Sequence, residues 1–176
     1  MYESSVAFDS CQFVGAKGED ALNLISCDFE LSYCDFYGSE SDSCDSDFSK
    51  GKIISCRFDK SGDDAIDLSG SSLDLKDVTI DGFVDKGISI GESSTVFMRE
   101  LKIKNGNVAI ACKDLSDATV HYCEIHNCEI GLSLYQKKKA YGPSALRFTH
   151  SSFENVETTT KVERGCVLLL GKNVKK

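Results

Sequence analysis

A short phrase returns six times along this chain at a nearly constant spacing. It consists of a cysteine or aliphatic residue, one intervening residue, and then a phenylalanine or isoleucine. That last member stands at Phe13, Phe36, Phe58, Ile80, Ile103 and Ile125, with gaps of 23, 22, 22, 23 and 22 residues. About eight residues later a small residue follows, at Ala21, Cys44, Ala65, Gly87, Ala109 and Gly131. So regular a period predicts a fold of stacked repeats.

Each repeat is built from short strands rather than helices. Apolar and polar residues alternate in the stretches 73–75, 78–80 and 88–90, and Gly, Asp, Ser and Asn fill the gaps between such stretches. A leucine-rich repeat would need a helix or an asparagine ladder in each unit, and the sequence suggests neither. We therefore predict an all-β, right-handed parallel β-helix solenoid of about seven coils, each of about 22 residues.

The chain has the length of one domain, so residues 1–176 are expected to form a single β-helix domain. A loop insertion is expected at about 136–143, because the ladder resumes late, at Leu146, Phe148 and Phe153. The start has no signal-peptide pattern, and it lacks the polar cap that solenoids need. We expect a fragment or module of a longer protein, extracellular or at the cell surface if that protein is secreted and cytoplasmic otherwise.

Nine cysteines suggest disulfides or zinc until the repeat is taken into account. Cys11, Cys34, Cys56 and Cys123 share one coil position, which other coils fill with Val78 and Leu101. A position that accepts valine or leucine points inward, and no Cys-x-x-Cys pair is present. The sequence predicts a ladder of small buried thiols at this position.

The charge is divided unevenly along the chain. Residues 1–92 carry 20 acidic and 7 basic side chains, a net −13, whereas residues 93–176 carry 8 acidic and 13 basic, a net +5. One interpretation is simple solvation; the other is a polar ligand, or a neighbour that packs head to tail. An acidic chain without interleaved basic and aromatic residues is not expected to bind nucleic acid, and no apolar stretch is long enough to span a membrane.

Charged residues recur on the strand that follows the small residue. Alternation places Asn23, Asp67, Ser89, Ala111 and Ser133 outward in one row, which Asp47 joins if the second coil contains a two-residue bulge. We call the predicted ligand-facing surface the charged strip. It comprises Asp45, Asp47, Asp64, Asp67, Lys86, Glu92, Lys113, Asp114, Gln136 and Lys137.

Several chemistries fit the charged strip. Stacked carboxylates repel one another, so Asp47, Asp64 and Asp67 could hold Ca²⁺, or neighbouring lysines could neutralise them. A polysaccharide lyase would use Lys86 or Lys113 as its base. A glycoside hydrolase would use two carboxylates, Asp47 with Asp67 or Asp64 with Asp67. The lysine run 137–139 is either a solvated loop tip or a contact for an anion.

The stretches DSDFS (45–49), GDDAIDLSGS (62–71), DKGISIGE (85–92) and YQKK (135–138) resemble the β-helix repeat modules of the pectate-lyase-like superfamily, of the kind found in large bacterial proteins beside spore-coat-kinase-like domains. The resemblance covers most of residues 11–153. It implies a right-handed β-helix and functions ranging from polysaccharide lyases, hydrolases and esterases to non-catalytic adhesins. The four arginines Arg57, Arg99, Arg147 and Arg164 all lie outside the outward row, unlike a pectate-lyase signature.

The expected function follows from these observations together. No catalytic set is complete, and aromatic platforms for sugars are sparse, since the chain has no tryptophan. We therefore expect a non-catalytic module for carbohydrate recognition or structural scaffolding, with a polysaccharide-active enzyme as the alternative. The expected partners are a polysaccharide, acidic ones included, and either neighbouring domains of a longer chain or further copies packed end to end.

Overall fold

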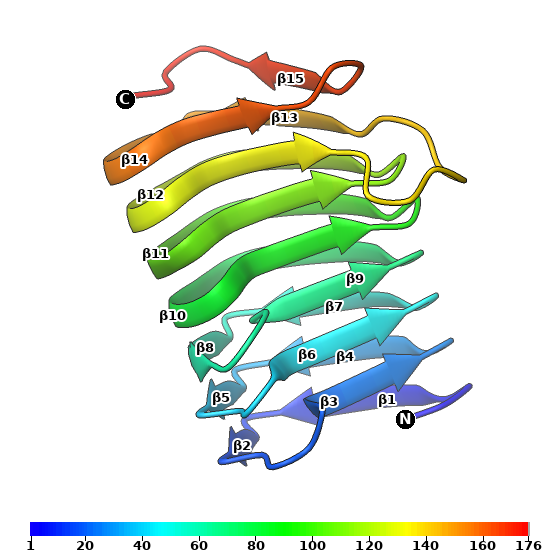
Figure 1. Ribbon diagram of the computed structural model, residues 1–176. Helices are drawn as coiled ribbons and strands as arrows, with labels where there is room; N and C mark the ends of the chain where they lie inside the picture. Colours follow the sequence, from blue (N-terminus) through cyan, green and yellow to red (C-terminus); the bar gives the residue numbers. More distant parts are fainter. Residues whose placement is uncertain (176) are drawn as a thin grey trace.

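The computed structural model describes residues 1–175 and shows a parallel β-helix (Figure 1). One path of paired strands runs through eight successive coils, and every strand pairing is parallel. The described residues contain no helix, and so none that could cross a membrane. The prediction of an all-β solenoid is confirmed, with about eight coils in place of about seven.

Each complete coil has three strand segments, which stack into three faces of the rod. Face 1 contains β1 (Ser5–Asp9), β4 (Asp28–Ser32), β7 (Lys50–Ile54), the beginnings of β10 (Ser72–Gly91), β11 (Thr95–Lys113) and β12 (Asp117–Tyr135), then β13 (Ala145–Thr149) and β15 (Val167–Leu170). Face 2 contains β2 (Gln12–Val14), β5 (Asp35–Tyr37), β8 (Arg57–Ser61), the middle of β10 to β12 and the beginning of β14 (Ser152–Val162). Face 3 contains β3 (Asp20–Ile25), β6 (Asp42–Asp47), β9 (Ile66–Ser69) and the ends of β10, β11, β12 and β14.

Residues in the left-handed conformation turn the chain at the corners. Between faces 1 and 2 every full coil has one such residue, with φ between 51° and 60°, at Ser10, Tyr33, Ser55, Asp77, Glu100, Tyr122 and His150. The residue that follows each of the first six belongs to the predicted cysteine row, and Ser151 continues this row in the next coil. Cys34, Cys56 and Cys123 are buried, as predicted, and all nine thiols are free. Cys11 is only half-buried, because no complete coil covers it from below.

A second internal ladder, of serines, lies at the corner between faces 3 and 1. The hydroxyl of Ser49 accepts the backbone N–H of Cys27 at 2.8 Å, and Ser71 accepts that of Ser49 at 3.0 Å. Ser94 and Ser116 repeat the contact at 3.0 and 3.1 Å for the next two coils. Each buried hydroxyl thus satisfies a backbone donor that the turn would otherwise leave unpaired.

Asparagines form a short ladder on the outside of the rod. Asn127 donates to Asn105 at 3.0 Å, and Asn155 donates to Asn127 at 2.8 Å. The ladder is confined to three coils, so it is not the asparagine in every repeat that a leucine-rich repeat would need. All three residues have positive φ, a conformation that asparagine tolerates better than most residues do.

The register of the second coil differs from the sequence prediction. Cys44 pairs with Leu22 and Ile66, so Ser43 takes the small-residue position beside Ala21 and Ala65. Those small residues then recur every 22 residues without exception. Strands β6 and β9 pair without a bulge, so Asp45 lies beside Asp67 and Asp47 lies beside Ser69. The two-residue bulge that would have brought Asp47 into the outward row is absent, so Asp47 lies outside that row.

Candidate functional site

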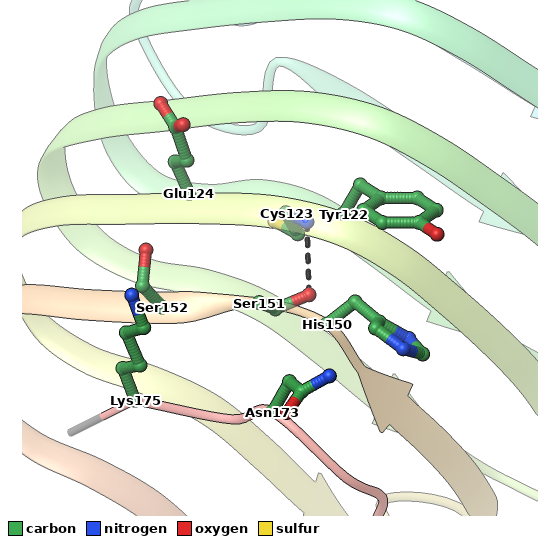
Figure 2. A pocket seen from close by; sticks show the side chains of 8 residues that line it. All are labelled: Tyr122, Cys123, Glu124, His150, Ser151, Ser152, Asn173 and Lys175. Carbon is green, nitrogen blue, oxygen red and sulfur yellow. Dashed lines mark hydrogen bonds between the residues drawn. The ribbon is translucent and has the colours of Figure 1, made fainter.

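One pocket, of about 500 Å³, lies near the C-terminal coil (Figure 2). The rings of Tyr122 and His150 stand 5.2 Å apart at its side, and the buried Cys123 donates its backbone N–H to Ser151. Burial raises the pKa of the Cys123 thiol, so this cysteine is not a thiolate nucleophile near neutral pH. The cysteine in this pocket is therefore a structural residue.

The candidate site lies on face 3, where the structure gathers most of the charged strip. The pairing from coil to coil aligns Asn23, Asp67, Ser89, Ala111 and Ser133 as predicted, with Asp45 instead of Asp47 in the second coil. Ser89, Ala111 and Ser133 are nevertheless buried. Ile66, Leu68, Ile88, Ile90, Leu132 and Leu134, which alternate with the outward residues, are buried in the core, as predicted. We call Asp42, Asp45, Asp64 and Asp67 the aspartate block.

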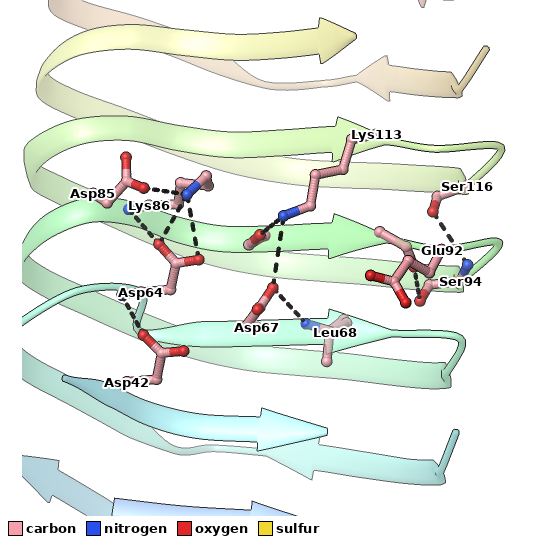
Figure 3. Close-up of polar contacts among 12 residues, drawn as sticks. Asp42, Asp64, Asp67, Leu68, Asp85, Lys86, Glu92, Ser94, Lys113 and Ser116 are labelled. Atoms are coloured by element: carbon pink, nitrogen blue, oxygen red, sulfur yellow. Dashed lines mark hydrogen bonds and ion pairs between the residues drawn. The ribbon is translucent and has the colours of Figure 1, made fainter. Parts of the chain in front are cut away.

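Asp64 is the most enclosed member of the aspartate block. It is 5% exposed, and its carboxylate accepts the backbone N–H of Lys86 at 2.9 Å and the ammonium group of Lys86 at 3.3 Å (Figure 3). One coil earlier, the carboxylate of Asp42 accepts the backbone N–H of Asp64 at 2.8 Å. Burial, opposed by Lys86, raises the pKa of Asp64 to about 6. Burial and the charge of Asp64 raise the pKa of Asp42 to about 7, although the bonded N–H opposes this.

Asp45 and Asp67 form the second stacked pair. Asn23 donates one hydrogen bond to Asp45 and one to Asp20, both at 2.9 Å. Burial raises the pKa of Asp45 to about 7, with further contributions from the charges of Asp47, Asp20 and Asp67. A carboxylate oxygen of Asp67 accepts the backbone N–H of Leu68 at 3.0 Å. Two adjacent coils therefore present carboxyl groups side by side.

Lys86 and Lys113 both lean toward the aspartate block. Lys86 also contacts Asp85, and although burial lowers its pKa, the hydrogen bond to Asp85 and the charge of Asp64 raise it overall. Lys113, 7% exposed, donates to the hydroxyl of Ser89 at 2.8 Å and lies 4.0 Å from a carboxylate oxygen of Asp67. It passes over Gly91, where a Cβ atom would come within 2.8 Å of its side chain.

The remaining residues of the charged strip lie at its edge, next to the insertion. Glu92 forms an ion pair with Lys138 of the loop. Asp114 is fully buried and accepts the backbone N–H groups of Lys137 and Lys138 at 2.7 Å, so it anchors the loop instead of facing a ligand. Gln136 donates its backbone N–H to Glu163 in the next coil at 2.7 Å.

Face 2 shows the opposite arrangement of charges. There, Lys104 pairs with Asp81 at 3.0 Å, and Arg57 pairs with Asp59 at 2.6 Å. His126 lies 3.1 Å from Glu154, in the following coil. On face 2 the stacked carboxylates of Asp59 and Asp81 therefore each have a basic partner, whereas on face 3 the ion pairs of the described residues reach Asp64 and Asp67 but not Asp42 or Asp45.

Of the three residues predicted for calcium, only Asp64 belongs to the group of carboxylates that could hold a metal ion together. Asp42, Asp63 and Asp64 can bring one oxygen each within 4.8 Å of the others, whereas Asp47 is not in register with Asp67. Carboxylate oxygens suit Ca²⁺. However, the ammonium group of Lys86 already supplies a counter-charge to Asp64, and backbone N–H groups occupy an oxygen of Asp42 and one of Asp64. The donors are of the right type, but a cation would have to compete with Lys86.

Sequence reasoning missed Asp42 because the second coil was misaligned. The signal was present: Asp20, Asp42, Asp64 and Lys86 recur every 22 residues. Aligning the small residues on Cys44 instead of Ser43 shifted Asp42 out of this row.

Comparison with known proteins agrees with the fold. A family model described as right-handed β-helix region matches residues 20–174, so the chain belongs to that family of right-handed β-helices. No curated protein matches the sequence. Among solved structures, a similar chain is a trypsin-treated variant of QnrB1, described as a plasmid-mediated fluoroquinolone resistance protein. It has 14% identity and a TM-score of 0.32 over 98% of this chain and 92% of that one, values that carry no functional argument.

Proposed function

We propose that this β-helix module binds an extended polysaccharide along face 3 without transforming it. The observation that supports this best is the stacking of Asp42 under Asp64 and of Asp45 under Asp67. Like charges in adjacent strands are destabilising, and on face 2 the stacked pair of Asp59 and Asp81 is neutralised by Arg57 and Lys104. Carboxylates repeated from coil to coil can accept hydrogen bonds from the hydroxyl groups of a polymer that runs along the rod.

A lyase mechanism has little support from the lysines. A general base must be deprotonated when it acts, and the raised pKa of Lys86 keeps it protonated. Lys113 is buried, and its ammonium group is bonded to Ser89. Both lysines are better suited to act as fixed positive charges than as general bases. In that role they position carboxylates or contact an acidic sugar.

A glycoside hydrolase remains the second candidate, because of one pair of residues. Asp45 and Asp67 are in register on strands about 4.8 Å apart. In retaining glycosidases the two carboxyl groups lie about 5 Å apart, and one of them has a raised pKa. The pKa of Asp45, about 7, suits the acid of such a pair.

Binding to a panel of neutral and acidic polysaccharides, measured by calorimetry with calcium or with a chelator, tests the proposal. The double variant Asp45→Asn/Asp67→Asn should lose binding. The control Asp28→Asn/Asp35→Asn removes two exposed carboxylates from faces 1 and 2 and should retain it. The proposal fails if Asp45→Asn/Asp67→Asn binds as the wild type does, or if the wild type itself binds no polysaccharide. Face 3 would then be a solvated surface of a scaffold. Release of reducing ends from a bound polymer, without formation of an unsaturated uronate, would favour the hydrolase.

A further inference from the structure

Within residues 1–175, the stack has an incomplete coil at each end. At the C-terminal end, β15 covers face 1, and the segment up to Lys175 reaches the beginning of face 2, where Lys175 pairs with Ser152. No described residue covers the end of β14 on face 3. At the N-terminal end, Tyr2 pairs with Ile25 at the end of face 3, and the other edge of β1 is unpaired among the described residues.

The two incomplete coils occupy different faces, so they are complementary. If a second copy is stacked with its N-terminal end on this C-terminal end, both part-coils fit into one shared turn. One copy supplies face 1 and the beginning of face 2, and the other supplies the end of face 3. The edge of β15 then meets the edge of β1 from the second copy, and both have unpaired backbone groups.

The inward rows of face 1 continue across such a junction. Two rows of stacked residues run the length of face 1, one from Val6 to Leu168 and the other from Phe8 to Leu170. Each coil contributes one apolar residue or glycine to each row. The next positions in these rows would be Val6 and Phe8 of the second copy. Leu170 is 40% exposed in a single chain, and the contact would remove it from water.

A groove lies where the first two residues of the second copy would be placed. It has a volume of about 420 Å³ and is lined by Ser133, Leu134, Tyr135, Lys161, Val162 and Glu163. Leu134 and Val162 belong to the same row as Leu24, and Met1 stands one coil before Leu24 in its own chain. If this inward row continues across the junction, Met1 of the second copy lies over Val162 of the first. Met1 is 53% exposed in a single chain.

The charges of the two ends are also complementary. Residues 1–25 carry four acidic and one basic side chain, and residues 152–176 carry three acidic and five basic. Head-to-tail stacking brings the acidic half of one rod against the basic half of the next. Stacking head to head would instead bring like charges together.

From these observations we propose that the chain assembles end to end with further copies of itself, the C-terminal coil of one on the N-terminal coil of the next. The contact is heterologous, so it can repeat along a filament. Parts of faces 2 and 3 stay empty in the shared turn. The association is therefore weaker than the stacking of coils within one chain and depends on protein concentration.

Variants that block one end each test this arrangement. Because the Ser10 N–H donates to Ser32 and successive N–H groups alternate in direction, the N–H of Ala7 points to the open edge of β1. Ala7→Pro removes this donor without breaking an internal bond. At the other end, Val162→Glu/Leu170→Glu adds negative charge that faces the acidic N-terminal end. The control Val84→Glu/Leu115→Glu changes two exposed apolar residues on the sides of the rod.

Sedimentation velocity over a range of concentrations is the measurement, with circular dichroism to verify folding. The wild type and the control should form oligomers that grow with concentration, and each blocked variant should stay monomeric alone. A mixture of the two blocked variants should form dimers that grow no further. A wild type that is monomeric throughout would mean that something other than a second copy covers the ends. Blocked variants that associate like the wild type would place the contact elsewhere, and either result overturns the proposal.

Discussion

Asp45 lies directly beside Asp67 on adjacent coils of face 3, with both side chains outward. The two residues are adjacent because their strands pair in parallel without a bulge. In the preceding coil, Asn23 lies beside Asp45 and donates a hydrogen bond to it from its side-chain amide. The nearest lysine, Lys113, approaches only Asp67, at 4.0 Å. The contact is therefore unfavourable for the fold when both groups are ionised.

Removing this repulsion should stabilise the protein. Asp45→Asn/Asp67→Asn should raise the free energy of unfolding by a few tenths to about 1 kcal/mol, because like charges directly opposite each other are removed. Urea unfolding at about pH 8, where the wild-type carboxyls are ionised, is the measurement. Asp28→Asn/Asp35→Asn should not stabilise the protein, since Asp28 lies beside Lys50 and Asp35 beside Arg57. An equal effect of both double variants would contradict the observed register.

The aspartate block should make stability depend on pH in an unusual direction. The folded-state pKa is about 7 for Asp42 and Asp45 and about 6 for Asp64, against an ordinary value of 3.8. Between these values the folded state binds more protons than the unfolded state. Stability from these groups is therefore fully present below about pH 4 and is lost as the pH rises through 6 and 7.

Thermal unfolding at a series of pH values checks this expectation. The wild type should melt at a higher temperature near pH 5 than near pH 8, and Asp42→Asn/Asp45→Asn should weaken the difference. A wild-type melting temperature that rises steadily from pH 5 to pH 8 would show that the carboxyls are stabilised in their charged form.

The buried thiols should react slowly in the native protein. Burial raises the pKa of Cys34, Cys56 and Cys123, and thiolates are the reactive form. Titration with a thiol reagent, followed by peptide mass analysis, should find these three unlabelled when the half-buried Cys11 and Cys166 have already reacted. Rapid labelling of the three without unfolding would contradict the inward placement of the row.

The serine ladder should contribute measurably to stability. Ser71→Ala leaves the buried backbone N–H of Ser49 without its acceptor, which should cost about 1–3 kcal/mol. Ser71→Cys should cost less, because Cys27 occupies the same row. Ser72→Ala, at an exposed neighbouring position, should change the free energy of unfolding by less than about 0.5 kcal/mol. Equal effects of the two alanine variants would remove the role assigned to the ladder.

The sequence by itself determined the repeat, the strand class, the inward cysteine row and most of the outward row on face 3. These follow from periodicity, because a side chain's place in a 22-residue coil decides whether it points inward or outward. Asp64, Asp67 and Lys86 could be selected on this basis alone. In the second coil, the polar strand 42–47 has a serine at an inward position, and this weak pattern allowed the misalignment on Cys44.

Only the tertiary structure decided which charges meet. Pairing with the coils on both sides set Asp45 beside Asp67 and Asp42 beneath Asp64, since a polar strand such as 42–47 specifies its own register only weakly. The loop after β12 turned Asp114 inward as an anchor, and the packing of neighbouring coils bent Lys113 over Gly91 toward Ser89. These contacts join residues more than 20 positions apart, and a local pattern carries no information about the distance between such groups.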